Sequence, residues 1–224
     1  MTRDFRLYDH LLQFSLFQGM SRAELLQMAG NTKFGFMKVA AGKPVVKEGD
    51  TCDTLYFLVS GRLSMVTRSD DGRYRVEEQL SSPWLLQPEA LFGIHTRFSS
   101  SVRTSSESHF ITLSKDEVFR LTDDFLIFRL NLLNLLSTQS QRRGHSQWRR
   151  PPSDLRQRIV RFLVDHCAYP AGPKVMYILM EQLGVEVNDS RLDVSRVLNA
   201  MQDEGLIVLH RGRIEVPSLE RLLM

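Results

Sequence analysis

Cysteine is scarce in this chain of 224 residues, which contains only Cys52 and Cys167. Two cysteines are too few for a disulfide framework. Neither belongs to a Cys-x-x-Cys pair or to a cysteine and histidine cluster with metal-ligand spacing. The sequence therefore gives no support to a zinc or iron–sulfur site, and it fits a reducing compartment.

Long hydrophobic runs are also missing. The first twelve residues mix charged and apolar side chains, so they contain no signal-peptide core. The most apolar stretch, residues 126–136, is too short to span a bilayer and is interrupted by Arg129, Asn131 and Asn134. We expect a soluble, cytoplasmic protein without a membrane partner.

The motifs of common enzyme classes do not occur either. We find no nucleophile elbow and no phosphate-binding glycine-rich loop. His95 and His109 lie in a β-rich region, where a cupin-like barrel could hold a catalytic metal, but they lack the His-x-His spacing of such sites. A metal-dependent, cupin-like enzyme is therefore the least favoured alternative, and we expect no enzyme activity, no metal and no cofactor.

Positive charge is concentrated toward the C-terminus. The first 140 residues carry 16 basic and 16 acidic side chains, so the whole net charge of +3 arises after them. Between residues 142 and 161, seven arginines accompany one acidic residue, Asp154. This local field suits a polyanionic partner, and a solvated linker face is the alternative interpretation.

The pattern of apolar residues changes along the first half of the chain. Apolar pairs at helical spacing predict two short helices within residues 5–31, and Ser21 followed by Glu24 indicates a capping box. From Phe34 to about Leu113, short β-rich runs alternate with turn residues, which is typical of an antiparallel barrel or jelly roll. The predicted strands are 43–47, 55–59, 62–68, 74–80 and 109–113.

A second helical region begins after Ser114, and residues 123–143 are predicted to form one long helix. Its apolar residues form two rows, so that one row can cover the barrel while the other meets a second copy of the chain. We predict that this helix makes a homodimer. A helix wedged between domains of a monomer is the alternative. The candidate dimer residues are Phe125, Phe128, Leu132 and Leu135, and the second row consists of Leu126, Leu130, Leu133 and Leu136.

Residues 144–152 are interpreted as a hinge, and the segment after this hinge has the spacing of a helix-turn-helix motif. A short helix with apolar residues on one face precedes a break at residues 188–190. Ser190 and Asp193 then cap a second helix that stops at Gly205. Two short runs flank a turn at residues 210–212 and predict a hairpin, or wing, whose tip carries Arg211 and Arg213.

The outer face of the second helix carries the chemistry of a DNA reader. Arginine can donate two hydrogen bonds to one guanine, and an exposed leucine can contact a thymine methyl group. The alternatives are a solvated face, with Arg191 and Arg196 paired to Asp203 or Glu204, and packing of Leu192 within the domain. The candidate DNA-binding residues are Ser190, Arg191, Leu192, Ser195, Arg196, Asn199, Arg211 and Arg213.

Two segments resemble the CRP/FNR family of bacterial transcription regulators, and the order of parts agrees over nearly the whole chain. The run from Asp53 to Arg62, which follows Gly49–Asp50, is similar to the family's barrel motif. The run from Ser190 to Leu198 is similar to its recognition helix. The resemblance implies that Ser190 touches phosphate while Arg191 and Arg196 read bases, with RNA polymerase as a further partner. Leu192 stands where the best-known members carry glutamate, so their operator is not carried over.

The resemblance also implies an effector pocket in the barrel, where the sequence departs from the family. Cyclic AMP-binding members hold the ribose with a Gly-Glu pair and the phosphate with an Arg-Ser pair. Here Gln87–Pro88 replace the first pair, and Phe98–Ser99 stand in place of the second. Glu89 is one place late and Arg97 one place early, and a shift of one strand residue points a side chain to the other face. We therefore expect no physiological binding of cAMP, with Glu89, Arg97, Phe98 and Ser99 lining the candidate pocket of an unknown small effector.

These observations predict an α+β protein with an N-terminal antiparallel barrel or jelly roll, a long dimerisation helix and a C-terminal winged helix-turn-helix. The expected boundaries are 1–120 for the sensor barrel, 121–150 for the helix and hinge, and 151–224 for the DNA-binding domain. We expect a homodimer that binds double-stranded DNA at a pseudo-palindromic operator. A ligand-binding or protein-interaction module without specific DNA binding is the alternative.

Overall fold

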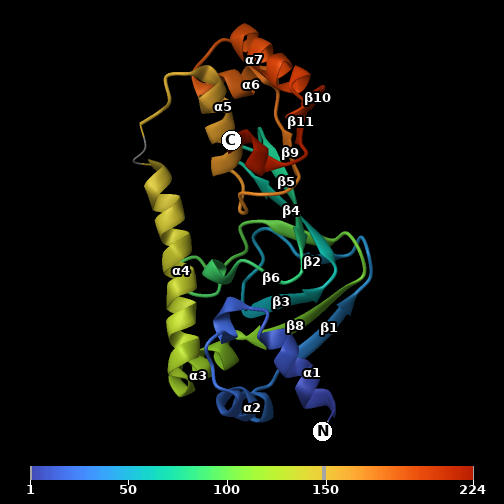
Figure 1. The fold of residues 1–224 in the computed structure, drawn as a ribbon, viewed down its shortest axis with the longest axis vertical. Coiled ribbons are helices and arrows are strands. Elements are labelled where there is room, and N and C mark those ends of the chain that lie inside the picture. Colours follow the sequence, from blue (N-terminus) through green and yellow to red (C-terminus); the bar gives the residue numbers. More distant parts are fainter. Residues whose placement is uncertain (1, 148–149, 224) are drawn as a thin grey trace. The chain divides into compact units, whose positions relative to one another are not determined.

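A computed structural model describes residues 2–147 and 150–223 (Figure 1). The chain packs as two units. We call residues 1–63 and 80–147 the barrel unit, and residues 64–79 and 148–224 the winged-helix unit. The predicted fold class is confirmed, since antiparallel sheets in the N-terminal half are followed by long helices and a helix-turn-helix.

The first half of the chain consists of two opening helices, a set of antiparallel strands and two closing helices. One sheet has the strand order β1-β8-β3-β6, and β2 pairs with β7 in a second sheet. Strands β4 and β5 begin or end in the barrel unit and continue into the winged-helix unit. In chain order the elements are α1 (Thr2–Leu11), η1 (Ser15–Phe17), α2 (Arg22–Asn31), β1 (Gly35–Val39), β2 (Pro44–Val46), β3 (Thr54–Ser60), β4 (Arg62–Arg68), β5 (Arg75–Ser81), β6 (Trp84–Leu85), η2 (Pro88–Ala90), β7 (Ser101–Thr104), β8 (Ser108–Ser114), α3 (Lys115–Asp124) and α4 (Leu126–Gln147).

All five strands predicted for the first half of the chain occur, but β1, β6 and β7 were not predicted, and neither was the later strand at residues 174–177. The first four residues of β3 alternate between partly exposed and buried, which is the pattern of a strand with one covered face, and Leu58 is buried as well. Strand β7 has the sequence Ser-Val-Arg-Thr with a single large apolar residue, Val102, and β6 is only two residues long. Such short or polar strands form because their backbone groups pair with neighbours distant in the sequence.

Local capping determines where several helices begin. The side chain of Ser21 accepts a hydrogen bond from the Glu24 amide at 3.2 Å, and the Glu24 carboxylate accepts one from the Ser21 amide at 2.8 Å. This confirms the predicted capping box. Ser114 caps α3 in the same way, accepting from the Glu117 amide at 3.2 Å.

The prediction of a single helix over residues 123–143 is wrong at both ends, because α4 begins at Leu126 and ends at Gln147. Phe125 has extended backbone angles (φ −127°, ψ 105°) and separates α3 from α4. Its ring is buried, so the chain bends where this side chain enters the core. At the other end α4 continues through Gly144 to Gln147, because one glycine costs a helix only about 1 kcal/mol. The part of the predicted hinge at residues 148–149 lies outside the described residues.

Within the barrel unit, aromatic rings join α4 to η1 and β3. Phe17 of η1 lies between Phe57 of β3, at a centroid distance of 5.6 Å, and Phe128 of α4, at 5.5 Å. Such tilted pairs add to the free energy gained by burying the rings. In the part of the chain that the structure describes, no helix is both long and apolar enough to cross a membrane.

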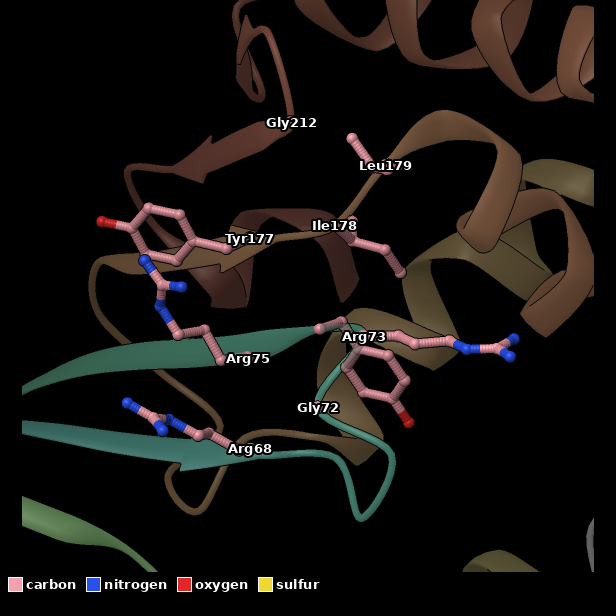
Figure 2. Close-up of a pocket in the computed structure, with 9 residues that line it drawn as sticks. Arg68, Gly72, Arg73, Arg75, Tyr177, Ile178, Leu179 and Gly212 are labelled. Carbon is pink, nitrogen blue, oxygen red and sulfur yellow. The ribbon is translucent and has the colours of Figure 1, made fainter.

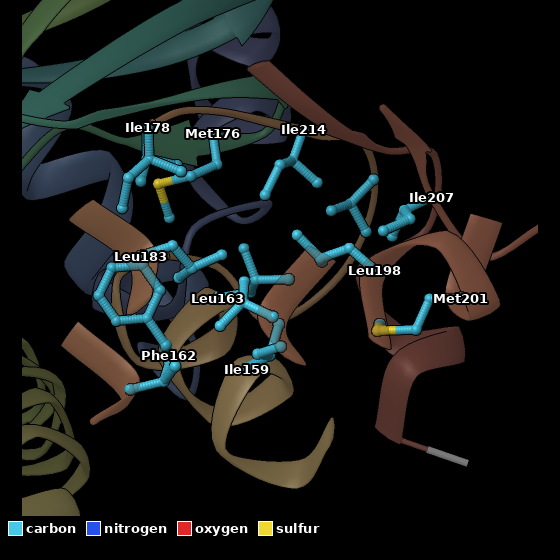
Figure 3. Close-up of a cluster of buried hydrophobic side chains, with 14 of the residues drawn as sticks. Ile159, Phe162, Leu163, Met176, Ile178, Leu183, Leu198, Met201, Ile207 and Ile214 are labelled. Carbon is cyan, nitrogen blue, oxygen red and sulfur yellow. The ribbon is translucent and has the colours of Figure 1, made fainter. Parts of the chain in front are cut away.

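The winged-helix unit has its own core between three helices and five strands of the second sheet, in the order β10-β11-β9-β5-β4. Figure 3 shows this core, in which Leu163, Leu183 and Leu198 point toward Met176 and Ile214 of the sheet. Its elements after the hairpin of β4 and β5 are α5 (Leu155–Asp165), β9 (Lys174–Tyr177), α6 (Met180–Val187), α7 (Arg191–Asp203), β10 (Val208–His210), β11 (Arg213–Val216) and η3 (Leu219–Leu223).

Strand β5 lies between β4 and β9 in this sheet and pairs with β9. The register runs antiparallel from Arg75 opposite Tyr177 to Glu78 opposite Lys174. Glu78 and Lys174 form a buried ion pair of 3.0 Å, with side chains 1% and 2% exposed. The Glu78 carboxylate also accepts hydrogen bonds from the amides of Ala168 at 2.9 Å and Tyr169 at 3.2 Å. The charge of Glu78 is thus compensated by one cation and two amide donors, as a buried carboxylate requires.

Candidate nucleic-acid interface and effector site

The predicted helix-turn-helix is present as α6, a three-residue turn and α7. Asn188 ends α6 in the left-handed conformation, with φ 52°. The turn passes so close to α6 that a Cβ on Gly184 would lie 2.9 Å from the carbonyl oxygen of Asp189. Only glycine fits there without a shift of the backbone.

Ser190 and Asp193 begin α7. The hydroxyl oxygen of Ser190 accepts from the Asp193 amide at 3.1 Å, and the hydroxyl donates to the Asp193 carboxylate at 2.6 Å. The capping predicted from these residues is confirmed. Ser190 is exposed at the amino end of the helix.

The two faces of α7 differ as helical spacing predicts. Val194, Leu198 and Met201 are fully buried. On the opposite side Leu192 is 70% exposed and the side chain of Arg196 is 76% exposed. Arg191 and Asn199 are exposed as well, and Ser195 is half-buried. The structure therefore places the predicted base-reading side chains on the outer face of the helix.

Arg196 has an ion pair with Asp193 at 3.0 Å, one turn earlier in α7, and not with Asp203 or Glu204, the partners of the alternative interpretation. Leu192 does not pack within the domain, which removes that alternative. Exposed ion pairs of this kind contribute little free energy. The Arg196 guanidinium can therefore leave Asp193 for a stronger partner at small cost.

The charge run predicts that the arginines before the motif face a polyanion, and for three of them the structure corrects this prediction. Arg156 makes two hydrogen bonds of 2.6 Å to Glu204, just after α7. These bonds hold the pKa of the Glu204 carboxyl below its ordinary value. Arg158 pairs with Asp189 and donates to the Val187 carbonyl at 3.0 Å. Arg161 is also held within the unit: its contacts are with Asp165 and with the Arg150 carbonyl.

These contacts make arginine a structural residue here. The fork of a guanidinium can satisfy several acceptors at once, and Arg158 uses this to hold the turn between α6 and α7. Sequence reasoning missed the role of Arg156 and Arg158 because their partners lie 48 and 31 residues away. No local signal identifies such partners.

The predicted wing is also present. Strands β10 and β11 pair antiparallel, with His210 opposite Arg213. Arg211 is exposed at the turn. Arg213 is half-buried and forms an ion pair of 2.7 Å with Glu215. Of the two wing arginines, Arg211 is therefore the one available to a phosphate.

The region of the candidate effector pocket is occupied by the chain's own side chains. Gln87 adopts the left-handed conformation with φ 35°, and its amide group is buried. Its Oε1 accepts from the amides of Ser99 at 2.8 Å and Ser100 at 3.1 Å, and its Nε2 donates to the Ser100 carbonyl at 3.1 Å. The Ser99 hydroxyl also donates to Gln87, at 3.0 Å. Gln87 thus binds the backbone donors of the segment that holds phosphate in cAMP-binding proteins.

Neither Phe98, at the phosphate position, nor Arg97, one place earlier, offers a free cation. Phe98 is buried against Tyr56, with the ring centroids 6.3 Å apart. Arg97 is exposed and donates to the Gly49 carbonyl at 2.7 Å. Glu89 lies in η2. Burial raises the pKa of the nearby Cys52 thiol, and the negative charge of Glu89 contributes a smaller part of this increase. The residues present therefore do not fit an anionic cyclic phosphate, which needs a charge-assisted donor.

The candidate dimer residues have a different environment from the second row of α4. Phe125, Phe128 and Leu132 are buried within the barrel unit, and Leu135 is half-buried. Leu126, Leu130 and Leu133 are 55%, 45% and 55% exposed. The first row covers the barrel, and the second row is the one open to a partner.

The histidines considered as metal ligands lie apart from any ligand cluster. His109 on β8 is exposed and contacts Glu107 at 3.5 Å, and His95 is exposed in a loop. Among the described residues no group of three or more histidine, cysteine or acidic side chains could hold a metal ion. Burial raises the pKa of the Cys167 thiol to about 12, so it remains protonated at neutral pH.

Comparison with known protein families gives two matches. Residues 36–125 match the cyclic nucleotide-binding domain, and residues 157–224 match the Crp-like helix-turn-helix domain. Among characterised proteins, the chain is 26% identical over 183 residues to the cAMP-activated global transcriptional regulator Vfr of Pseudomonas aeruginosa, covering 76% of this chain and 83% of that protein. It is also 26% identical over 180 residues to the cyclic AMP receptor protein of Thermus thermophilus, covering 78% and 80%.

Solved structures show the same fold. The sensor domain of the transcriptional regulator DNR from Pseudomonas aeruginosa superposes with a TM-score of 0.54 at 19% identity, covering 65% of this chain and 95% of that one. A transcriptional regulator of the Crp/Fnr family from Eubacterium rectale gives a TM-score of 0.51 at 19% identity, covering 94% and 97%.

Proposed function

Because the chain belongs to the CRP/FNR family of DNA-binding transcription regulators, we propose that it reads a pseudo-palindromic operator as a homodimer through the outer face of α7. The observation that carries this proposal is the exposure of Leu192 and Arg196 opposite a fully buried face of α7. A helix with one face fixed in a core presents the other face rigidly to the major groove.

The roles of the individual side chains follow from their chemistry. We assign base contacts to Arg191, Leu192 and Arg196, with Ser195 and Asn199 beside them on the helix. Ser190, at the helix start, and Arg211, at the wing turn, are assigned to phosphates, which position the protein without selecting sequence. Arg213 supports the wing through Glu215.

Replacing Arg196 by alanine is expected to cost about 1–3 kcal/mol of binding free energy and to relax the preference at one base pair. Arg211→Ala, the matched control, should weaken binding to all sequences about equally, since a phosphate contact carries no sequence information. Competition binding against duplexes that differ at single positions measures both effects. An Arg196→Ala protein with unchanged sequence preference would contradict the assignment.

Members of this family act as dimers, and we propose that two copies of this chain meet through α4. Support comes from the exposed leucines at 126, 130 and 133, which are spaced by four and three residues as at the seam of a coiled coil. The same spacing continues to Ser137, Ser140 and Gly144, which are also exposed. Small residues at these positions would let two helices approach closely.

We further propose that the protein divides functionally into a sensor barrel at residues 1–120, a dimer helix and hinge at 121–150, and a DNA-binding domain at 151–224. The two family matches, at residues 36–125 and 157–224, support this division. Contact with RNA polymerase is typical of the family and is proposed here on that ground. A cytoplasmic location is proposed because that is where bacterial DNA is read.

Control by cAMP is not part of the proposal, although relatives are named for it. A cyclic phosphate carries a full negative charge, and its burial without a cationic partner costs several kcal/mol. Here Phe98 stands at the phosphate position, Pro88 lacks an amide donor, and Gln87 already occupies the backbone donors. We propose that another small effector, or the amount of protein alone, controls DNA binding.

Calorimetric titration of the ligand-free protein with cAMP is therefore expected to show no saturable binding at micromolar concentrations. Vfr, which is named as cAMP-activated, serves as the positive control in the same buffer. One-to-one binding at low micromolar affinity would show that Arg97 or another cation reaches the phosphate, and that the proposed register is wrong.

A further inference from the structure

The hairpin of β4 and β5 brings arginines to the rim of a pocket in the winged-helix unit. The pocket has a volume of about 410 Å³, and its lining includes Arg68, Arg73 and Arg75 together with Tyr177 and Gly212. No aspartate or glutamate belongs to the lining. A concave surface with several cations and no carboxylate has a strongly positive potential.

Two of these arginines lie beside one another. The Ser69 amide donates to the Tyr74 carbonyl at 3.0 Å, which places the flanking residues Arg68 and Arg75 opposite each other in the antiparallel hairpin. Figure 2 shows their guanidinium groups on the same side of the two strands. Like charges directly opposite one another destabilise a hairpin, so this pair is unfavourable unless an anion lies between the strands' side chains.

Arg68 and Arg75 are also free to bind, in contrast to Arg73. Arg73 contacts Asp71 at 3.2 Å and Gln182 at 3.4 Å, and in Figure 2 it points away from the other two. Within residues 2–147 and 150–223, neither Arg68 nor Arg75 has an ion pair. Arg75 lies over the ring of Tyr177, 3.9 Å from its centroid, and this stacking fixes its guanidinium while leaving its donors exposed.

The pair is continuous with the wing. Gly212 of the wing turn lines the same pocket, and its carbonyl accepts a hydrogen bond from the Ile178 amide at 3.1 Å. The neighbouring residue in the turn is the exposed Arg211. A ligand that contacts Arg211 and extends across the pocket would therefore need negative charges repeated along its length, as a nucleic-acid backbone has.

We propose that Arg68 and Arg75 form a phosphate-binding site that extends the DNA contact from the wing onto the hairpin of β4 and β5. Its occupants are backbone phosphates of duplex DNA outside the base pairs read by α7. This inference rests on the proposed function and adds a second class of contact to it. The contact carries no sequence information and lengthens the bound DNA segment.

The test measures how the whole 224-residue chain binds two duplexes. One ends at the sequence selected by the wild type, and the other extends it by a helical turn on each side. Each phosphate contact contributes about 0.9 to the slope of log K against log salt concentration. On the long duplex, Arg68→Ala with Arg75→Ala removes two phosphate-binding cations and should lower the magnitude of this slope by about 1.8. On the short duplex the two proteins should have similar slopes.

Two further double variants test whether the salt slope depends on positive charge at residues 68 and 75 or on any pair of exposed arginines. Arg68→Lys with Arg75→Lys keeps two cations and should retain most of the slope. Arg62→Ala with Arg103→Ala removes two other exposed strand arginines and should leave the slope unchanged. An unchanged long-duplex slope in Arg68→Ala with Arg75→Ala, or an equal loss in the Arg62 and Arg103 variant, would overturn the proposal.

A small phosphate compound is the other source of the same chemistry, and calorimetric titration with sodium pyrophosphate tests it. We expect no saturable binding. Two results together would overturn the DNA assignment and show that the site binds a free phosphate compound instead. The first is micromolar binding of pyrophosphate that disappears in the double variant Arg68→Ala with Arg75→Ala. The second is an unchanged salt slope for this variant on the long duplex. Failure of the proposed function would be seen separately, because the wild-type protein would then bind all DNA sequences with about the same affinity. The salt slope on any long duplex would still report on the hairpin arginines.

Discussion

Replacing Leu130 by aspartate is expected to produce monomers at micromolar concentration and to weaken operator binding by about 10²–10⁴-fold. Leu130 lies in the middle of the exposed row of α4 and is 45% exposed. In a two-fold symmetric dimer the substitution places a carboxylate on each helix of the same interface. Burying two like charges there opposes association, and each recognition helix would then bind its half-site without the other.

Sedimentation equilibrium measures the mass, and fluorescence anisotropy with a labelled duplex measures the affinity. Leu26→Asp is the matched control, because Leu26 on α2 is equally exposed, at 44%, but lies outside α4. It should remain dimeric. A monomeric mass for the unmodified protein, or a dimeric Leu130→Asp protein, would contradict the proposed interface.

Removing Glu78 is expected to have the largest effect on stability. Glu78→Ala leaves the Lys174 ammonium, which is 2% exposed, and two backbone amides without their acceptor. Breaking a buried ion pair on one side costs about 3–5 kcal/mol. The cost should appear in the urea-induced unfolding of the winged-helix unit, and the backbone amides of β9 should lose protection from hydrogen exchange.

A double variant separates the charge from the packing. Glu78→Met with Lys174→Met removes both charges and keeps apolar volume in the site, so it should recover most of the stability lost in Glu78→Ala. A free energy of unfolding for Glu78→Ala within about 1 kcal/mol of the wild-type value would contradict this account. It would show that the ion pair does not hold β5 against β9.

The helix-turn-helix could be predicted from the sequence because its signals are local. Ser190 and Asp193 cap α7 three residues apart, and the periodicity of Val194, Leu198 and Met201 identifies its buried face. The exposure of Leu192 and Arg196 then follows from helical geometry alone. The capping box of Ser21 and Glu24 was predictable for the same reason.

Features that depend on distant partners could not be predicted. The pairing of β5 with β9 joins residues about one hundred positions apart, and nothing in the run from Arg75 to Glu78 indicates that partner. The structural role of Arg156 and Arg158 depends on Glu204 and Asp189, so the charge run gave the wrong interpretation of these arginines.

The assignment of rows on α4 shows where periodicity is insufficient. Two apolar rows were visible in the sequence, but periodicity does not say which row meets the barrel. The break at Phe125 and the contact of Phe128 with Phe17 decide this, and both depend on tertiary packing. Gln87 is a similar case, because its hydrogen bonds to Ser99 and Ser100 join segments that the tertiary fold brings together.

If this chain reads a two-fold symmetric DNA sequence through α7, the duplexes that it selects must carry that symmetry. Selection of bound duplexes from a random pool, followed by sequencing, tests this when the wild type and Arg196→Ala are compared. The wild type is expected to enrich inverted half-sites with centres roughly 34 Å, or one helical turn, apart. Arg196→Ala should enrich the same half-sites with one position relaxed in each. Enrichment of no sequence, or of an asymmetric one that Arg196→Ala selects unchanged, would show that α7 does not read DNA in this way.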